Sequence, residues 1–347
     1  MLIIIKIMKT FKYLVIFLTV LFLSCSAQPQ QKSIFVANWN LENLFDTKDD
    51  PNKNDEEFLP NSPRHWTAER LNNKLKNLAS VIKFMNDNNG PDLLGVEEVE
   101  HKYILETMIK KYLNNKNYKI AYAESPDHRG IDNGLIYNSD LFKLIKIEKL
   151  TIPLKNNYTT RYVLHVIMEF RNSKLHIFVN HWPSRREGLK KSEPNRIAAA
   201  TILKKSVNKI LDKNSNARII ILGDFNDLPS NISIKRILRA KEFKCNSISG
   251  ISKNDLFNLS FKIFQEGEGS YRYRSHWNML DQIIVSGNLI NGKLVHYKCN
   301  SFHIIKPPFM VEHNGRYEGY PLPTYGGRKY LGGYSDHFPV GATFLFN

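Results

Sequence analysis

Cysteine is scarce in this chain, with three among 347 residues: Cys25, Cys245 and Cys299. A long low-complexity linker and an internal repeat of short period are also missing, so the sequence predicts neither a solenoid nor a string of small domains. No zinc-finger, helix-turn-helix or RRM signature is present, which argues against recognition of particular bases. The steady alternation of apolar segments and turns over residues 33–347 predicts one large domain.

Residues 1–27 have the pattern of a secretory signal peptide. Within them, residues 13–23 form an unbroken apolar run, YLVIFLTVLFL, shorter than the roughly 20 residues that a membrane-spanning helix needs. Three lysines precede the run, Lys6, Lys9 and Lys12. The pattern predicts export. Met8 begins a more conventional signal than Met1, and the sequence leaves the true start open.

Cys25 follows Leu23 and Ser24 in a sequence that resembles a bacterial lipobox, in which the cysteine is acylated and becomes the mature N-terminus. Acylation of Cys25 would anchor the exported protein to a membrane. The alternative is ordinary cleavage after Ala27, which would release a soluble secreted protein. Cys245 and Cys299 would then meet an oxidising compartment, where the sequence leaves open whether they pair.

Positive charge outweighs negative charge, with 49 Lys and Arg against 33 Asp and Glu, a formal net charge of +16. The signal segment contributes three of these charges and no acid, so the remainder carries +13. A polyanion such as nucleic acid is the natural partner. The alternatives are an anionic membrane surface or a lysine-rich composition without functional meaning.

Several short β-rich runs end in a cluster of polar residues, which predicts strands that deliver polar side chains to one rim of a sheet. These runs are SIFVANWNLEN from Ser33, DLLGVEEVE from Asp92, DNGLIY from Asp132, KLHIFVNHW from Lys174, RIIILGDFND from Arg218 and MLDQIIVS from Met279. Helices are predicted between them over residues 67–89 and from Ser192, with Pro194 in the first turn. Interleaved strands and helices favour two packed sheets with helices outside.

The segment DTKDDPNKNDEE, residues 46–57, superficially resembles a calcium-binding loop. Asp50, Asn52 and Asn54 alternate as oxygen ligands, but the sixth position is Asp55 instead of glycine and the twelfth is Asn61 instead of glutamate. We therefore predict a solvated surface loop.

Hydrolysis of a phosphodiester needs oxygen ligands for a hard cation, a base, an acid and hydrogen-bond donors for the developing charge. The chain carries all of these in WNLEN with Asn40, GVEEVE with Glu98, VNHWPSR with His181, GDFND with Asp224 and Asn226, LDQIIVS with Asp281, and YSDHFPV with Asp336 and His337. In this order the motifs resemble the endonuclease/exonuclease/phosphatase superfamily, and within it the bacterial deoxyribonuclease-like membrane nucleases. The resemblance runs from about residue 34 to the C-terminus. GDFN followed over a hundred residues later by SDH is its most specific part.

The resemblance implies a four-layer α/β/β/α sandwich of two packed mixed sheets flanked by helices. It also implies that Asn40, Glu98 and Asp336 surround a magnesium or manganese ion, with calcium as an alternative. Glu98 is preferred because the family usually reads Gln-Glu here and the second residue is the acid. Glu97 stands in the place of the Gln, and we assign it no role.

The resemblance further implies the catalytic roles. His337 would accept a proton from the attacking water, and Asp281 would bind its other ring nitrogen. His181 would protonate the leaving oxygen or hold the scissile phosphate. Asp224 would orient water or metal, and Asn226 would donate to a phosphate oxygen. Some relatives exchange acid and base, and both one and two metal ions are argued, so these points stay open.

The choice of phosphodiester depends on the loops around this site. Arg185 follows His181 closely, and an alternating run predicts a strand with Arg272 and Arg274 on one face, where both would bind substrate phosphates. We predict a monomeric nuclease that cuts DNA, with RNA as an alternative, without sequence preference. The runner-up hypothesis is a phosphatase or phosphodiesterase of small or lipid phosphate esters. A binding lipoprotein without activity is the third.

Overall fold

The computed structural model describes residues 32–155, 158–246, 250–252 and 254–346, and residues 33–346 form one unit. The predicted signal segment, residues 1–27, and the predicted acylation site Cys25 lie outside the described residues. Among the helices that are described, none is both long enough and apolar enough to cross a bilayer.

Two large mixed sheets form the centre of the fold. The first has the strand order β14-β18-β1-β2-β4-β3, with β15 also paired to β18, and only β1 and β2 are parallel. Its strands are β1 (Ser33–Leu44), β2 (Leu93–Val99), β3 (Tyr118–Tyr122), β4 (Asp132–Asn138), β14 (Val295–Tyr297), β15 (His303–Ile304) and β18 (Val340–Phe346).

The second sheet has the strand order β5-β6-β7-β8-β13-β10-β9, with parallel pairs β7/β8 and β9/β10. Its strands are β5 (Lys143–Leu150), β6 (Val163–Phe170), β7 (Ser173–His181), β8 (Arg218–Asp224), β9 (Ala240–Glu242), β10 (Leu256–Asn258) and β13 (Asp281–Ser286). The remaining strands form two hairpins, β11 (Tyr271–Tyr273) with β12 (His276–Asn278), and β16 (Tyr325–Gly326) with β17 (Lys329–Tyr330).

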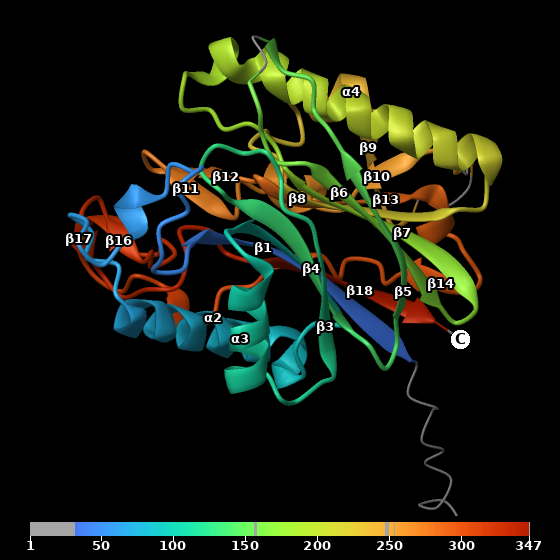
Figure 1. The fold of residues 1–347 in the computed structure, drawn as a ribbon. Coiled ribbons are helices and arrows are strands. Elements are labelled where there is room, and N and C mark those ends of the chain that lie inside the picture. The colour runs from blue at the N-terminus through green and yellow to red at the C-terminus, as the bar shows by residue number, and fades with distance from the viewer. Residues whose placement is uncertain (1–31, 156–157, 247–249, 253, 347) are drawn as a thin grey trace, which may run out of the picture. The chain divides into compact units, whose positions relative to one another are not determined.

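Helices cover the outer face of each sheet, as Figure 1 shows. Helices α2 (Ala68–Asn88) and α3 (Lys102–Tyr112) pack on the first sheet, and α4 (Leu189–Lys213) packs on the second. Short helices lie in the connections: α5 (Phe261–Gln265), η1 (Glu56–Phe58), η3 (Ser233–Leu238), η4 (Gly287–Leu289), η5 (Pro308–Met310) and η6 (Gly315–Tyr317). The four-layer α/β/β/α prediction is confirmed.

The predicted helix starts are right in one case and wrong in the other. Thr67 caps α2 by accepting a hydrogen bond from the Arg70 amide at 3.3 Å, as a threonine before an amphipathic segment predicts. Helix α4, however, begins at Leu189, one turn before the predicted start at Ser192. The Ser192 amide already donates to the Gly188 carbonyl at 3.1 Å, so Pro194 lies inside the helix.

Three apolar layers hold the sandwich together: one between the sheets, one under α2 and α3, and one under α4. Strand β1 contributes to the first two. Its residues Ile34 and Val36 pack between the two sheets, whereas Phe35, Ala37 and Trp39 pack under α2 and α3. Side chains alternate along a strand, so Asn38 and Asn40 continue the face that lies between the sheets. The sequence thus places these two amides at the rim of the central core.

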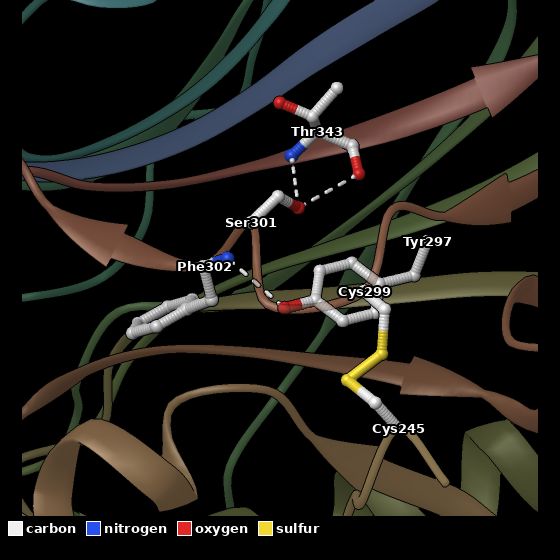
Figure 2. Close-up of a disulfide and its surroundings, with 6 residues drawn as sticks. All are labelled: Cys245, Tyr297, Cys299, Ser301, Phe302 and Thr343. Carbon is white, nitrogen blue, oxygen red and sulfur yellow. Dashed lines mark hydrogen bonds between the residues drawn. A yellow bond between two sulfur atoms is a disulfide. The ribbon is translucent and has the colours of Figure 1, made fainter.

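A disulfide joins Cys245 to Cys299, with a Cα–Cα distance of 5.8 Å (Figure 2). It links the segment after β9 to the turn after β14, where the Phe302 amide donates to the Tyr297 hydroxyl at 3.0 Å. The pairing that the sequence left open is therefore present in the folded chain.

Candidate active site

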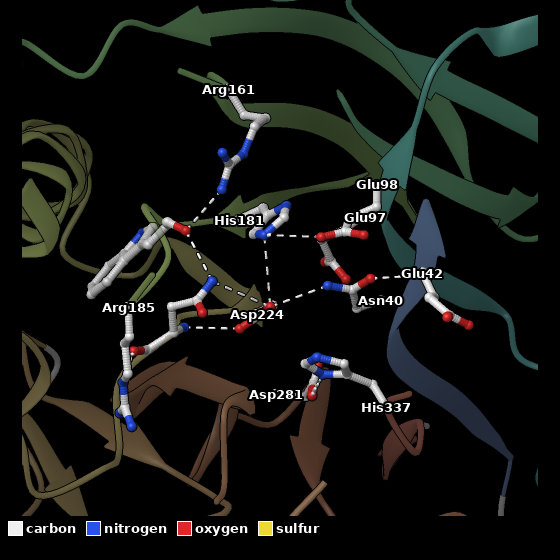
Figure 3. Close-up of polar contacts among 12 residues, drawn as sticks. Asn40, Glu42, Glu97, Glu98, Arg161, His181, Arg185, Asp224, Asp281 and His337 are labelled. Atoms are coloured by element: carbon white, nitrogen blue, oxygen red, sulfur yellow. Dashed lines mark hydrogen bonds and ion pairs between the residues drawn. The ribbon is translucent and has the colours of Figure 1, made fainter. Parts of the chain in front are cut away.

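Polar side chains replace apolar ones where the strands of both sheets end at the same rim. On β7 the inward residues Ile177 and Val179 are followed by His181, and on β8 Leu222 is followed by Asp224. The register sets His181 beside Asp224, and Asp224 beside Asp281 of β13. Three predicted residues therefore form a row across neighbouring strands, and Figure 3 shows them facing Asn40 and His337.

His337 and Asp281 form the shortest link between the predicted catalytic groups. The His337 Nδ1 atom lies 2.7 Å from Asp281 Oδ2, and the Ser270 hydroxyl donates to the same oxygen at 2.6 Å. Burial acts to lower the pKa of His337, but the negative charges of Asp281, Asp336 and Asp224 outweigh it. The pKa stands well above its ordinary value. The pairing predicted for these two residues is present in the structure.

Asp224 lies at the centre of the row. The Asn40 side-chain amide donates to Asp224 Oδ2 at 3.1 Å, and the Asn226 backbone amide donates to Asp224 Oδ1 at 2.8 Å. Burial, with a contribution from the nearby Asp281, raises the pKa of Asp224 to about 6. The Asn226 side chain donates to the Trp182 carbonyl at 3.0 Å, so its amide group lies beside the site.

His181 is buried on the opposite side of Asp224 from Asp281. Its Nε2 atom lies 3.7 Å from Asp224 Oδ2 and 3.8 Å from Glu98 Oε1, and its Nδ1 atom has no hydrogen-bond partner in the described part of the chain. Burial lowers the pKa of His181 well below its ordinary value, and the nearby Arg161 lowers it further. These surroundings favour the neutral imidazole form of His181.

Glu98 breaks the alternation of its strand. Its φ of 62° lies in the left-handed region, and the register between β2 and β4 shifts between Val96 and Val99. The turned carboxylate accepts a hydrogen bond from the Asn43 amide at 2.8 Å. Local strain at a site residue is therefore what directs this predicted ligand toward His181.

Glu97, which had no assigned role, is fully buried at 0 % exposure. The Asn38 amide bridges it to Asp281, with 3.2 Å to Glu97 Oε2 and 3.4 Å to Asp281 Oδ1. Burial first, and then Asp281 and Asp224, raise the pKa of Glu97 well above its ordinary value. A protonated carboxyl group carries one donor and one acceptor, as the Gln expected at this position does. Side chains alternate along a strand, so Glu97 shares the inward face of β2 with Leu93 and Gly95, and its position there was predictable from the sequence.

Asp336 lies among several charged groups. Burial raises its pKa to about 7; the charges of Glu42 and Glu98 raise it as well, while His337 and Lys74 act in the opposite direction. Glu42 and Lys74 were not predicted as site residues. Lys74 interrupts the apolar face of α2 between Leu71 and Leu78, and that interruption was the available signal.

The donor set suits a hard divalent cation. Asn40, Glu98 and Asp336, with Asp224 beside them, offer amide and carboxylate oxygens where negative groups outnumber Lys74 and His337. Asn40 and Asp224 are buried, and Glu98 and Asp336 are partly buried. Oxygen ligands of this kind are those that magnesium and manganese accept while keeping several waters.

The predicted substrate-binding arginines have different surroundings. Arg185 donates to the Asn226 carbonyl at 2.5 Å and to Asn278 Oδ1 at 3.2 Å, so it also fixes the loop that follows β8. Arg272 stacks on Tyr320, 4.4 Å from the ring centre. The expectation that Arg274 shares a strand face with Arg272 is wrong, because β11 ends at Tyr273 and Arg274 turns back with a φ of 47°.

A cavity of about 450 Å³ opens next to Asp336. Arg272, Arg274 and Arg316 line it together with Tyr271, Tyr273 and Tyr320. The β11–β12 hairpin and the long segment before β18 thus supply a basic and aromatic wall beside the predicted metal ligands.

The comparison with known families decides which group of proteins this chain belongs to. Residues 35–345 match the Endonuclease/Exonuclease/phosphatase family. The chain belongs to this family. Its members act on phosphate ester bonds and generally depend on a divalent metal ion, so the chain is a hydrolase of phosphate esters. No curated protein matches the chain.

Solved structures of the family share the fold at low sequence identity. D. rerio TDP2 complexed with single-strand DNA product is 14 % identical, with a TM-score of 0.55 over 90 % of this chain and 99 % of that one. The human Nocturnin catalytic domain with bound sulfate is 16 % identical, with a TM-score of 0.54 over 92 % and 98 %. A family protein from Bacteroides thetaiotaomicron is 14 % identical, with a TM-score of 0.51 over 92 % and 99 %.

Proposed function

We propose that the chain is an exported, metal-dependent endonuclease that cleaves DNA without sequence preference, with RNA as an alternative substrate. The observation that carries the proposal is the Asp281–His337 pair, 2.7 Å apart, set against the row of Asp224 and His181 and beside Glu98. A proton-accepting histidine, a second histidine and a set of hard oxygen ligands are what hydrolysis of a phosphodiester requires.

In this mechanism Asp281 holds the proton on Nδ1 of His337. A bound cation would offset the charges of Asp336 and Asp224 that help to raise the pKa of His337, and Nε2 would then be free to take the proton of the attacking water. The new bond forms between the water oxygen and phosphorus, and the bond from phosphorus to the leaving oxygen breaks. Because its pKa is lowered, His181 is neutral and donates a hydrogen bond to the scissile phosphate, while the leaving oxygen takes a proton from solvent. Asn226 donates to a phosphate oxygen, and Asp224 orients the water.

Asn40, Glu98 and Asp336 would hold the cation, which we propose is magnesium or manganese, with calcium as the alternative. When bound, it neutralises charge that develops on the phosphate oxygens. The same negative groups that raise the pKa of Asp336 and Asp224 favour its binding.

Nucleic acid is the proposed substrate on three grounds. The formal net charge of +13 outside the signal segment attracts a polyanion. The cavity beside Asp336 offers Arg272 for phosphates and Tyr320 for base stacking. A structurally similar protein, D. rerio TDP2, was crystallised with single-strand DNA product.

Export is proposed from the signal-like residues 1–27, and the Cys245–Cys299 disulfide supports it, because such bonds persist in oxidising compartments. If Cys25 is acylated, the enzyme is a membrane-anchored lipoprotein of the cell envelope. We propose a monomer.

The test is incubation of purified protein with supercoiled plasmid and magnesium or manganese, with and without chelator. We expect nicking that the chelator abolishes, with no preferred fragment pattern. A plasmid that stays intact with every metal would contradict the proposal.

A second candidate function is favoured by the size of the cavity, since about 450 Å³ accommodates a small phosphate ester. Release of phosphate or a headgroup without plasmid nicking would select it.

A further inference from the structure

The loop of residues 46–57, for which the sequence predicts a solvated surface, places two of its acids inside the protein. Asp46 is 6 % exposed and Asp55 is 1 % exposed. The Asp46 backbone amide donates to Glu100 Oε2 at 2.7 Å, which ties the start of the loop to the end of β2. Further along, the Asn54 amide donates to the His128 carbonyl at 2.7 Å. The loop therefore folds back over the strand end that carries Glu98 and Glu100.

This folding brings several ligand atoms together. One ligand atom from each of Asp46, Glu100 and His101 lies within 4.8 Å of the others. The carboxyl group of Asp55 lies in the neighbourhood of Glu100. One of its oxygens accepts the Asp50 amide at 3.0 Å. The other, Oδ1, is buried and has no hydrogen-bond partner in the portion of the chain that the structure describes.

The charge of this cluster is not balanced by side chains. No ion pair among the described residues involves Asp46, Asp55 or Glu100. The ammonium group of Lys53 belongs to the same loop, but it donates to the carbonyl oxygens of Ser125 at 3.2 Å and Asp127 at 2.9 Å. Buried carboxylates are normally paired or bound to a metal ion, so the unpartnered oxygen of Asp55 is suited to bind a cation.

We propose that Asp46, Asp55 and Glu100 form a second metal site, separate from the catalytic centre, that binds one calcium ion. Calcium takes six to eight oxygen ligands in flexible geometry, so three carboxylates completed by carbonyl oxygens and water suit it. His101 lies at the rim of the site, where its Nδ1 atom is 3.2 Å from Glu124 Oε1. The site is unlike the helix-loop-helix calcium loop, because its ligands come from a loop and a strand end far apart in sequence.

The site has a consequence for the catalytic centre. Asn43 lies three residues before Asp46, and its backbone amide donates to the Glu98 carboxylate at 2.8 Å. A cation between Asp46 and Glu100 would fix the residues that follow β1 to those that follow β2, just beyond that contact. The second site would therefore position Glu98 without touching the substrate.

The test uses calcium alone, added to chelator-treated full-length protein, and measures thermal unfolding and stoichiometry by equilibrium dialysis. We expect one calcium ion at this second site, counted apart from calcium held at the catalytic centre, and it should raise the Tm by about 5 °C at a hundredfold excess over its Kd. Asp55→Asn should lose this ion and its shift. Asp49→Asn, which removes the same charge from an exposed position of the same loop, should keep both.

The variant Asp336→Asn removes a proposed ligand of the catalytic centre and leaves the second site unchanged. Neither thermal unfolding nor equilibrium dialysis requires turnover, so the result does not depend on the proposed function. The variant should retain the calcium shift. Loss of the shift in Asp336→Asn with retention in Asp55→Asn would overturn the proposal, and so would the absence of a calcium shift in the unmodified protein. If Asp55→Asn does not fold, Asp46→Asn takes its place. Terbium luminescence excited through Tyr103, whose hydroxyl contacts Asp46, then reports occupancy. Equal luminescence with and without Asp46→Asn contradicts the site.

Discussion

Asp281 Oδ2 and His337 Nδ1 lie 2.7 Å apart inside the protein, and they bring together β13 and the segment that leads into β18. Asp281 is itself held by Ser270 and Asn38, so its carboxylate has little freedom to leave the histidine. A carboxylate that is fixed in this way determines which ring nitrogen keeps the proton and stabilises the imidazolium that forms.

Removal of the ring in His337→Ala should reduce kcat by about 10²–10⁴ while the fold is kept, because general acid–base catalysis contributes about that much. Asp281→Asn should have a comparable effect, since an amide no longer fixes the tautomer. Circular dichroism and plasmid-nicking rates measure the two effects. His303→Ala, at an exposed histidine, serves as the matched control. Retention of full activity in His337→Ala would refute the assigned role.

The stability of the metal-free protein should depend on pH through the acidic residues of the site. The pKa of Asp224 is raised to about 6 and that of Asp336 to about 7, above an unfolded value of 3.8, so the folded state binds protons more tightly. Stability should therefore fall as pH rises from about 4 to about 7. The raised pKa of His337 acts in the same direction at higher pH.

Thermal unfolding in chelator between pH 5 and pH 8 tests this prediction. The decline in Tm with rising pH should be smaller in Asp336→Asn than in the unmodified protein. The lowered pKa of His181 has the opposite effect on stability below pH 6.5, but both proteins contain this histidine, so it does not affect the comparison. The Tm gain from magnesium should be larger at pH 8 than at pH 5, since protons compete with the cation. An equal gain at both pH values would show that the ion binds elsewhere.

Lys74 joins α2 to the segment before β18. Its ammonium group donates to Thr324 Oγ1 at 2.5 Å and to the Tyr334 carbonyl at 2.6 Å, and it lies 3.4 Å from Glu42. Lys74→Met should cost about 3–5 kcal/mol because it leaves Glu42 buried without its counter-charge. Urea unfolding measures the loss, and the exposed Lys76→Met should change stability by no more than about 0.5 kcal/mol. Equal stability of the two variants would contradict the bridging role.

Removal of the disulfide should lower stability without affecting the catalytic centre. The bridge closes a loop with a sequence separation of 54, and native disulfides typically contribute about 2–4 kcal/mol. Double replacement by Cys245→Ser and Cys299→Ser should shift urea unfolding by that amount, whereas kcat at 25 °C should stay within about twofold of the unmodified value. A large loss of kcat in a folded double variant would mean that the bridge also shapes the site.

The strand-end residues were predictable because the period of two leaves little choice. Once Ile177 and Val179 face the inner core, His181 must follow on the same face, and the same reasoning applies to Asp224 after Leu222. Glu97 followed that rule too, but the resemblance to the family's Gln-Glu pair directed attention to Glu98, whose left-handed φ no pattern predicts.

Loop residues were harder to place because tertiary contacts decide their positions. Arg185 donates to Asn226 and to Asn278, which lie on different segments of the chain. Arg274 follows the end of its strand at a turn that the alternating sequence does not predict. The burial of Asp55 and the Cys245–Cys299 bond likewise depend on distances between segments remote in sequence. Local propensity contains no information on such distances.

The pairing of β1 with β18 has a practical consequence for assays. Ser33 is opposite Leu345 at one end of the sheet, whereas Asn40 lies further along the same strand, about 23 Å away at the rise of an extended chain. A linker attached ahead of Ser33 enters the domain at the end remote from the catalytic rim. Immobilising the protein on beads or a sensor chip through that linker should therefore leave long DNA free to reach the rim, which makes single-molecule cleavage measurements practicable.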